Sequence, residues 1–370
     1  MDTLSHRRSF SLTSTNLCKG IAIILMYFHH SFYDANSWSE CEVIFAPLTQ
    51  NQTIYLALLG KVCVHIFVLL SAFGTYRSTP PDRTTRVTYP QTVKRRYLHL
   101  AGSFLLIYLL TQIFSSVISS SRLEVYGADP LARWFYTVVD ALGLAVPLGT
   151  PSYNATWWYM YLAMILIFLL PLLSRLVDRI GWTLLPLTLL LIWGLKIDAS
   201  SDALPRYLPV AVTGILLAKY QVFERVYDFL SRRIGLLLLG IPVLLVLMAC
   251  TGYLRSIFGL DYILLSLLAV WICFFCFLYL EQIPGLRQVL YFLGKHSMNM
   301  FLTHSLIRNS ASKLHAFSYA PKYPILIILL LLADTLLLSI AIEGLKKLLG
   351  FLWSNMKLRF NDAPSSSSSH

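Results

Sequence analysis

The sequence has few charged residues for its length. Only 13% of its 370 residues are Asp, Glu, Lys or Arg, whereas charged residues make up about a quarter of an ordinary soluble domain. This scarcity argues against a soluble protein. Hydrophobic residues instead make up 56% of the chain, and they occur in long continuous runs, which is typical of a protein that crosses a membrane several times.

Signatures of metal binding and of a serine nucleophile are also missing. The six cysteines show no zinc-ligand spacing. Cys273 and Cys276 form C-x-x-C inside the apolar stretch WICFFCFLYL, where we interpret them as small packing residues. No G-x-S-x-G occurs, and no acidic partner stands at ligand spacing from the histidines. We therefore expect no metal site and no permanently bound cofactor. We also expect no signal peptide, because no small-residue cleavage site follows the first apolar run.

The apolar runs predict an all-α fold, a polytopic membrane helix bundle with about ten transmembrane helices. The predicted helices cover 18–33, 54–76, 97–118, 157–174, 182–195, 205–221, 234–251, 260–280, 289–308 and 324–346. The segments 182–195 and 205–221 are short and contain proline. We expect them to be thinner than a full span, or kinked at Pro186 and Pro209.

The positions of Lys and Arg predict the orientation of the bundle. With the N-terminus inside, most of the 30 Lys and Arg residues fall in inner segments, and both termini are cytoplasmic. The chain then divides into a cytoplasmic tail (1–17), a transmembrane domain (18–346) and a second tail (347–370) whose end is disordered. The basic excess reflects topology, so we expect no nucleic-acid partner. The apolar stretch 132–148 would reverse this charge bias if it crossed, so we predict an interfacial or re-entrant element.

Titratable residues inside the predicted helices are few, and such residues usually mark functional sites. Lys19 stands at the cytoplasmic end of the first helix, and His30 follows about 16 Å further along its axis. His29 is turned from His30 by about 100° and is interpreted equally well as a packed ring. His65 and His304 lie at comparable depth on two other helices. These positions predict one polar pocket inside the membrane.

The loop 77–96 (RSTPPDRTTRVTYPQTVKRR) is the most basic predicted cytoplasmic stretch. It contains six cations against one acid, Asp82, which would suit a phosphorylated ligand. Ordinary positive-inside bias explains the same pattern equally well. Ser71 lies about 9 Å deeper in its helix than His65. It either contributes a hydroxyl to the pocket or bonds to its own helix.

Five stretches of the chain together resemble the membrane acyltransferase-3 family, over roughly residues 17–346. That family places a basic residue, ten residues and a His on its first helix, and Lys19 and His30 fit this spacing. VHIFVLLSAFGTYR is similar to its F-F-V-L-S-G-F run, and VKRRYLHL to its Arg-rich entry to the third helix. WWYMYLAMILIFLLPLL keeps its Trp and Pro spacing through Trp158 and Pro171. LGKHSMNMFLTH resembles its G-x-x-S-x-x-x-Y-L-x-H.

The sequence departs from the family pattern at four of these positions. Ala72 stands for Gly, Phe301 for Tyr, and His65 occupies a place where an acid is common. Ala163 stands where the family frequently has Glu, so any role of that acid does not transfer to this chain. The chain resembles the stand-alone form, without an additional hydrolase-like domain.

The resemblance implies a membrane-bound O-acyltransferase, acting on groups other than aminoacyl, in the plasma (cytoplasmic) membrane. It would transfer a short acyl group, with acetyl the first expectation, from cytosolic acyl-CoA as co-substrate. The acceptor would be a hydroxyl of an extracytoplasmic polysaccharide or glycolipid, and membrane lipids would surround the bundle. His30 would be the catalytic residue, either as a general base or as a transient acyl carrier.

Substrate-binding roles are expected for eight further residues. They are Lys19, Arg95 and Arg96, with Arg77 as a weaker candidate, for the donor phosphates; His65, Ser71 and His304 for orienting His30 or stabilising the oxyanion; and Trp158. The alternative function is a transporter or flippase of a glycan or lipid-linked substrate. Many helices and a basic inner face fit such a protein, although no clear inverted repeat is present.

Overall fold

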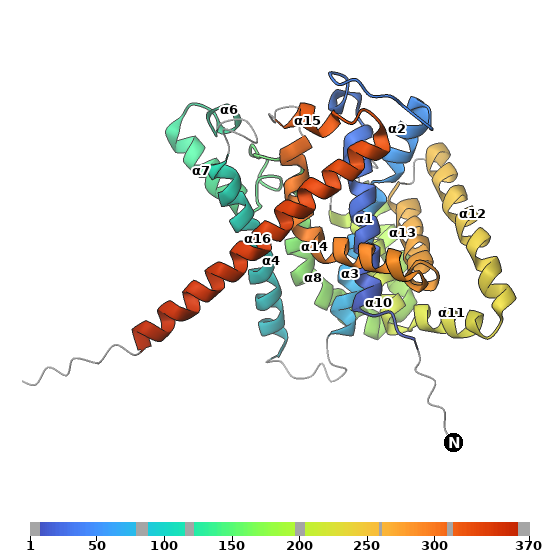
Figure 1. Cartoon of the computed structure of the whole chain (residues 1–370). Helices are drawn as coiled ribbons and strands as arrows, with labels where there is room; N and C mark the ends of the chain where they lie inside the picture. Colours follow the sequence, from blue (N-terminus) through green and yellow to red (C-terminus); the bar gives the residue numbers. More distant parts are fainter. Residues whose placement is uncertain are drawn as a thin grey trace, which may run out of the picture.

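The computed structural model describes residues 8–78, 88–114, 122–196, 204–258, 261–308 and 314–361, and every regular element within these ranges is helical (Figure 1). The longer helices are α1 (Leu12–Phe32), α3 (Val62–Arg77), α4 (Thr88–Ile113), α8 (Trp158–Ile180), α12 (Ile234–Phe258), α13 (Asp261–Leu278), α14 (Pro284–Arg308) and α16 (Pro324–Asn361). The shorter ones are α2 (Gln50–Leu59), α6 (Arg122–Tyr126), α7 (Pro130–Ala141), α9 (Leu184–Gly194), α10 (Leu208–Lys219), α11 (Val222–Ser231) and α15 (His315–Tyr319). The all-α prediction is confirmed.

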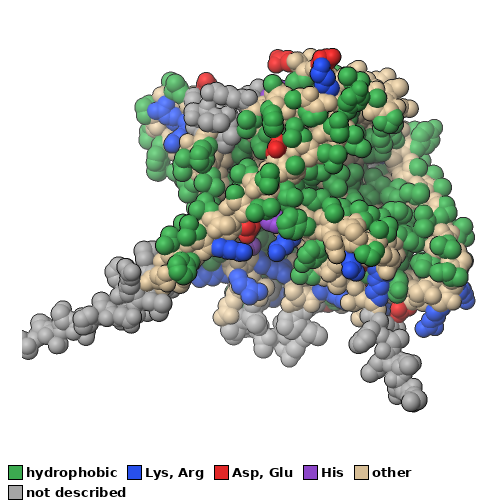
Figure 2. All heavy atoms as spheres, in the orientation of Figure 1, with side chains coloured by type: hydrophobic (Ala, Val, Ile, Leu, Met, Phe, Trp, Pro, Cys, Tyr) green, Lys and Arg blue, Asp and Glu red, His purple; other side chains and the backbone are tan. Residues whose placement is uncertain are grey.

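Five helical segments of the described chain are long and apolar enough to cross a membrane. They are Gln50–Arg77, Ala155–Gly194, Ile234–Ile257, Asp261–Gln282 and Pro324–Asn355. The protein is therefore a polytopic membrane protein. Figure 2 shows hydrophobic side chains over the middle of the visible face, with many Lys and Arg side chains near its lower edge. The count of about ten spans stays a prediction.

Helices α1 and α14 form the centre of the bundle, and glycine lets their backbones touch. A Cβ on Gly20 of α1 would overlap the carbonyl oxygen of Leu290. A Cβ on Gly294 of α14 would overlap the carbonyl oxygen of Asn16. Both positions therefore exclude any side chain while the helices keep this distance. The glycine of the LGKHSMNMFLTH stretch thus has a packing role.

Helix α1 begins earlier than predicted, at Leu12 instead of residue 18. Ser11 caps it: its Oγ accepts from the backbone N–H of Thr13 at 3.1 Å, and the Ser14 Oγ accepts from the Ser11 N–H at 3.1 Å. This reciprocal capping box satisfies backbone donors that a helix start leaves open. Residues 12–17 therefore belong to the first helix.

The predicted helix 54–76 is divided in the structure. Helix α2 ends at Leu59 and α3 starts at Val62. Gly60 lies at the break, where a Cβ would approach the carbonyl oxygen of Leu25 to 2.6 Å and His29 Cβ to 3.0 Å. The break therefore lets the chain pass close to α1, beside the two histidines.

The two proline-containing segments correspond to α9, with 11 residues, and α10, with 12 residues. Both are short, which agrees with the expectation that they are thinner than a full span. Neither Pro186 nor Pro209 lies in the interior of its helix, where a proline would kink it. Pro209 lies at the start of α10, and Pro186 lies in the first turn of α9. A first-turn proline loses no hydrogen bond, because its N–H would have no helical partner.

The stretch 132–148 contains most of α7 and the turns that follow it. With 12 residues, α7 is about 18 Å long, too short for a hydrocarbon core of about 30 Å. The buried Asp140 ties it to the chain that leads into α8, since its carboxylate accepts from the Ser152 hydroxyl at 2.9 Å and the Tyr153 N–H at 2.6 Å. The interfacial interpretation fits this short helix.

Candidate active site

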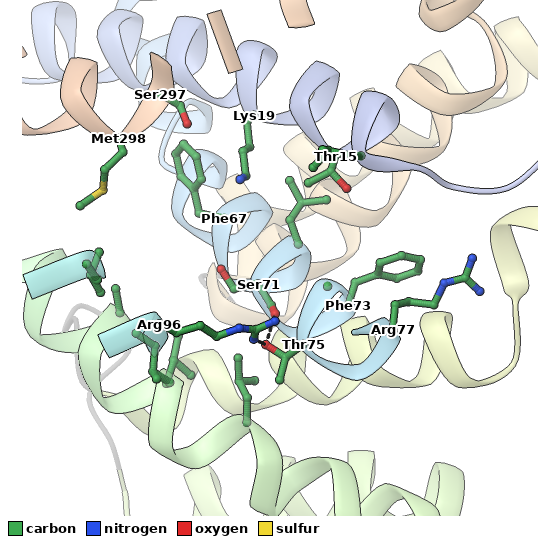
Figure 3. Close-up of a pocket in the computed structure, with 18 of the residues that line it drawn as sticks. Thr15, Lys19, Phe67, Ser71, Phe73, Thr75, Arg77, Arg96, Ser297 and Met298 are labelled. Atoms are coloured by element: carbon green, nitrogen blue, oxygen red, sulfur yellow. Dashed lines mark hydrogen bonds between the residues drawn. The ribbon is translucent and has the colours of Figure 1, made fainter. Parts of the chain in front are cut away.

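The larger cavity of the site lies among α1, α3, α4, α8 and α14 (Figure 3). Its volume is about 570 Å³, within the range of about 300–1,000 Å³ that small-molecule sites occupy. Its lining includes the cations Lys19, Arg77 and Arg96, together with Ser71 and His99. No acid lies among the described lining residues. We call this space the basic cavity.

The three cations of the basic cavity differ in their partners. Arg77 forms an ion pair with Glu224 at 3.0 Å, which neutralises its charge. Arg96 donates instead to two hydroxyls, Thr75 Oγ1 at 2.5 Å and Ser78 Oγ at 2.6 Å. Within the described chain, Lys19 pairs with no acid, and Figure 3 shows its ammonium group directed into the cavity. Lys19 and Arg96 therefore give the basic cavity positive charge available to an anion.

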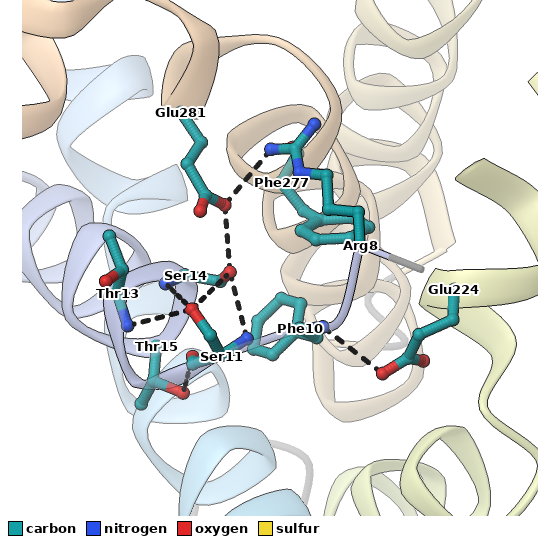
Figure 4. Close-up of polar contacts among 9 residues, drawn as sticks. All are labelled: Arg8, Phe10, Ser11, Thr13, Ser14, Thr15, Glu224, Phe277 and Glu281. Carbon is teal, nitrogen blue, oxygen red and sulfur yellow. Dashed lines mark hydrogen bonds and ion pairs between the residues drawn. The ribbon is translucent and has the colours of Figure 1, made fainter. Parts of the chain in front are cut away.

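The N-terminal segment forms part of the cavity wall through Phe10, Ser11 and Leu12. Figure 4 shows the polar contacts of this segment. The Phe10 N–H donates to Glu224 at 3.2 Å, and its ring stacks on Phe223 at 4.3 Å between centroids. Arg8 pairs with Glu281 at 3.2 Å, and Ser14 donates to the same carboxylate at 2.8 Å. These contacts hold residues 8–14 against α11 and against the short 3-10 turn, Leu280–Gln282, that follows α13.

A second, much smaller space surrounds His30. Its volume is about 20 Å³, which is room for roughly one water molecule. Its lining includes His30, Cys63, Thr156 and Trp158. The His30 ring lines this space and forms no hydrogen bond with a described residue. We call this space the histidine chamber.

His304 lies directly against His30, with ring centroids 5.0 Å apart. Its Nδ1 donates to the carbonyl of Phe301 at 2.6 Å, and its ring stacks on Tyr27 at 5.4 Å. The Nδ1 bond leaves Nε2 as an acceptor. That nitrogen is buried and has no hydrogen-bond partner in the described chain.

The neighbouring His29 has a different environment. Its Nδ1 donates to the carbonyl of Ala57 at 2.8 Å, and its ring stacks on Tyr33 at 4.6 Å. It lines neither the basic cavity nor the histidine chamber. The rotation between successive helix positions thus separates a packed ring, His29, from a ring that faces a cavity, His30.

The other predicted site residues fall into three groups. Lys19, Ser71, Arg77 and Arg96 line the basic cavity, whereas Trp158 lines the histidine chamber and His304 contacts His30. His65 and Arg95 line neither space. The His65 ring is buried against Tyr207, 5.2 Å between centroids, and Arg95 is exposed.

The two spaces adjoin, and three aromatic residues line both: Phe67, Tyr159 and Phe301. Helix α1 passes from Lys19 in the basic cavity to His30 in the histidine chamber. The structure thus places a cation and an unpaired imidazole on one helix, on opposite sides of an aromatic boundary.

Sequence reasoning missed the wall formed by the N-terminal segment. The Ser11-x-x-Ser14 spacing was the available signal, because it marks a helix start before the apolar run. Thr156 was also missed. Its hydroxyl lies 2.9 Å from that of Ser305 on α14. This contact joins segments that are distant in the sequence, so no local pattern predicts it.

These features describe a helical membrane protein with a polar site enclosed in its bundle. The family model described as an acyltransferase domain, that of the acyltransferase-3 family, matches residues 12–344. The chain therefore belongs to the acyltransferase-3 family and is an acyltransferase, as the five stretches predicted. Neither the comparison with curated proteins nor the comparison with solved structures gives a match.

Proposed function

We propose that this protein transfers a short acyl group from cytosolic acyl-CoA to a hydroxyl of an extracytoplasmic glycan, as an O-acyltransferase of the plasma membrane. The observation that carries the proposal is the placement of Lys19 and His30, which line adjoining spaces from a single helix. Both termini are then cytoplasmic and about ten helices span the membrane. The gathering of Lys and Arg near one edge of the bundle supports this orientation (Figure 2).

The basic cavity suits the donor. The phosphates of acyl-CoA need cations, and Lys19 and Arg96 supply charge that no described acid neutralises. Arg77 has a smaller part, because Glu224 already pairs with it. The apolar remainder of the wall, with Leu70 and Leu166, suits the arm that carries the thioester.

The histidine chamber suits the chemistry. The neutral His30 imidazole accepts the proton of the acceptor hydroxyl as its oxygen attacks the thioester carbonyl carbon. The C–O bond forms, the C–S bond breaks, and the CoA thiolate leaves and takes up the proton from His30. The contact with His304 positions the His30 ring, and Trp158 lines the same chamber, where it would contact the acceptor. His65 and Arg95 have no substrate contact in this scheme.

The test uses the purified protein in lipid vesicles, with radiolabelled acetyl-CoA and a polysaccharide acceptor. We expect label in the acceptor and one free CoA thiol per transfer. His30→Ala should lower the transfer rate by about 10²–10⁴-fold, the usual contribution of a general base.

His29→Asn is the matched control, because its amide can keep the hydrogen bond to the Ala57 carbonyl. It should retain most of the activity. Transfer by the His30→Ala protein at the wild-type rate would rule out the catalytic role. A wild-type protein that moves intact glycan across the vesicle membrane but releases no CoA would be the transporter of the alternative interpretation.

A further inference from the structure

The boundary between the two spaces is made of three aromatic rings from three different helices. Phe67 comes from α3, Tyr159 from α8 and Phe301 from α14. The ring centroids of Phe67 and Tyr159 are 6.2 Å apart, and those of Tyr159 and Phe301 are 5.4 Å apart in an edge-to-face arrangement. These are contact distances for aromatic pairs. The rings therefore form one connected cluster between the two spaces, which we call the aromatic partition.

The spaces on the two sides of this partition differ greatly in size, about 570 Å³ against about 20 Å³. A donor held by Lys19 and Arg96 lies on the large side, whereas His30 lies on the small side. The acyl end of the donor must pass the partition before the thioester carbon meets a hydroxyl activated by His30. The chamber beyond has room for a group of about the size of one water molecule or methyl.

The partition is supported by its neighbours. The backbone carbonyl of Phe301 accepts the hydrogen bond from His304, and the two rings are 6.1 Å apart. Phe301 is a buried residue, 8% exposed, whereas Phe67 and Tyr159 are half-buried at the edge of the basic cavity. Because packed interiors resist even one added methylene, a longer acyl chain would have to displace rings that other contacts hold in place.

We infer that Phe67, Tyr159 and Phe301 are the specificity-determining residues that select the acyl group by size, admitting acetyl to His30 and excluding longer chains. This inference rests on the proposed function. It deepens that function by assigning the acyl class of the donor and the residues that enforce it. A hydrophobic pocket of this kind discriminates by about 10–200-fold for each methylene.

The test compares kcat/KM for acetyl-, propionyl- and butyryl-CoA in the same vesicle assay. Wild-type protein should prefer acetyl-CoA over butyryl-CoA by at least about 10-fold. Phe301→Leu and, separately, Phe67→Leu should raise the propionyl-to-acetyl ratio by about 10-fold, because each removes part of a ring from the partition. Phe104→Leu is the matched control. Phe104 is a buried ring packed on Trp157 at 5.2 Å that lines neither space, so its variant should keep the wild-type ratio.

The possible outcomes distinguish a failure of acyl-group selection from a failure of the proposed function. Partition variants that fold, transfer acetyl and keep the wild-type propionyl-to-acetyl ratio would show that the partition does not select the acyl group. The proposed function would still stand. The same follows if Phe104→Leu shifts the ratio equally, because the effect would then be general loosening. A wild-type protein that transfers no acyl group from CoA would overturn the proposed function itself. Melting temperatures of all variants show which of them fold, and two independent partition variants keep the test decisive if one does not.

Discussion

The basic cavity and the histidine chamber are neighbours, but they differ in size and in the charge of the residues that line them. The basic cavity is wide, and it exposes charge from Lys19 and Arg96 that no described acid cancels. The histidine chamber is much smaller, and the titratable side chains among its described lining residues are His30, Cys63 and Tyr159. One space is suited to holding a charged donor, and the other to a proton transfer.

This difference separates the charged part of the site from the part that needs a neutral imidazole. A cation deep in the hydrocarbon is costly, so donor recognition belongs near a membrane surface. An imidazole can be neutral near physiological pH, so it can stand further in. Helix α1 joins the two, with Lys19 and His30 separated by about 16 Å along its axis.

The largest effect is expected from a substitution that separates α1 from α14 and so disrupts both spaces. Gly294→Ala places a Cβ onto the carbonyl oxygen of Asn16, which forces α1 and α14 apart. Overpacking of this kind costs about 1–3 kcal/mol or more. We expect a lower melting temperature in detergent and little acyl transfer.

Gly344→Ala is the control for this change. Gly344 also lies in a helix, α16, but a Cβ there meets nothing within 4 Å. Its melting temperature should stay the same or rise slightly, because alanine favours helix. Equal melting temperatures for the Gly294→Ala and wild-type proteins would contradict the close α1–α14 contact.

The next effect concerns the basic cavity alone. Lys19→Gln removes an unpaired cation and should raise the KM for acyl-CoA by about 10–100-fold, since a hydrogen bond to a charged group contributes about 1.5–3 kcal/mol. The kcat should change much less, because Lys19 lies away from His30. Steady-state kinetics with varied acyl-CoA check this. A fall in kcat with KM unchanged would place Lys19 in the chemistry instead.

The smallest effect distinguishes two adjacent arginines. Arg96→Gln should raise the KM for acyl-CoA by a few-fold, up to about 10-fold. The effect is smaller because Arg96 lines the cavity but also donates hydrogen bonds to the Thr75 and Ser78 hydroxyls. Arg95→Gln should leave the KM unchanged, because Arg95 is exposed and lines neither space. The same kinetic assay compares the two, and equal effects would mean that general surface charge attracts the donor.

The sequence could predict what a single rigid helix determines. Lys19 and His30 lie on α1, so their spacing fixes their distance and the rotation that separates His30 from His29. In the structure Lys19 lines the basic cavity and His30 lines the histidine chamber, whereas His29 lines neither. The helical class and the family also followed from local runs and short motifs.

Features that need several segments could not be predicted in this way. His65 and His304 looked equivalent because both lie at similar depth, but only His304 contacts His30. Depth follows from position along a helix, whereas the direction a side chain faces depends on which helices are neighbours. The aromatic partition likewise depends on three helices meeting, and the family motifs showed Phe67 and Phe301 without showing that Tyr159 joins them.

The most direct test of the division between the two spaces measures donor binding and acyl transfer on the same protein. Calorimetric Kd values for acetyl-CoA and transfer rates in vesicles are compared for wild type, His30→Asn and Lys19→Gln. We predict that His30→Asn binds acetyl-CoA within about twofold of wild type but loses transfer by about 10²-fold or more, while Lys19→Gln binds about 10-fold or more weakly. Loss of donor binding in His30→Asn, together with full binding in Lys19→Gln, would contradict the division of roles.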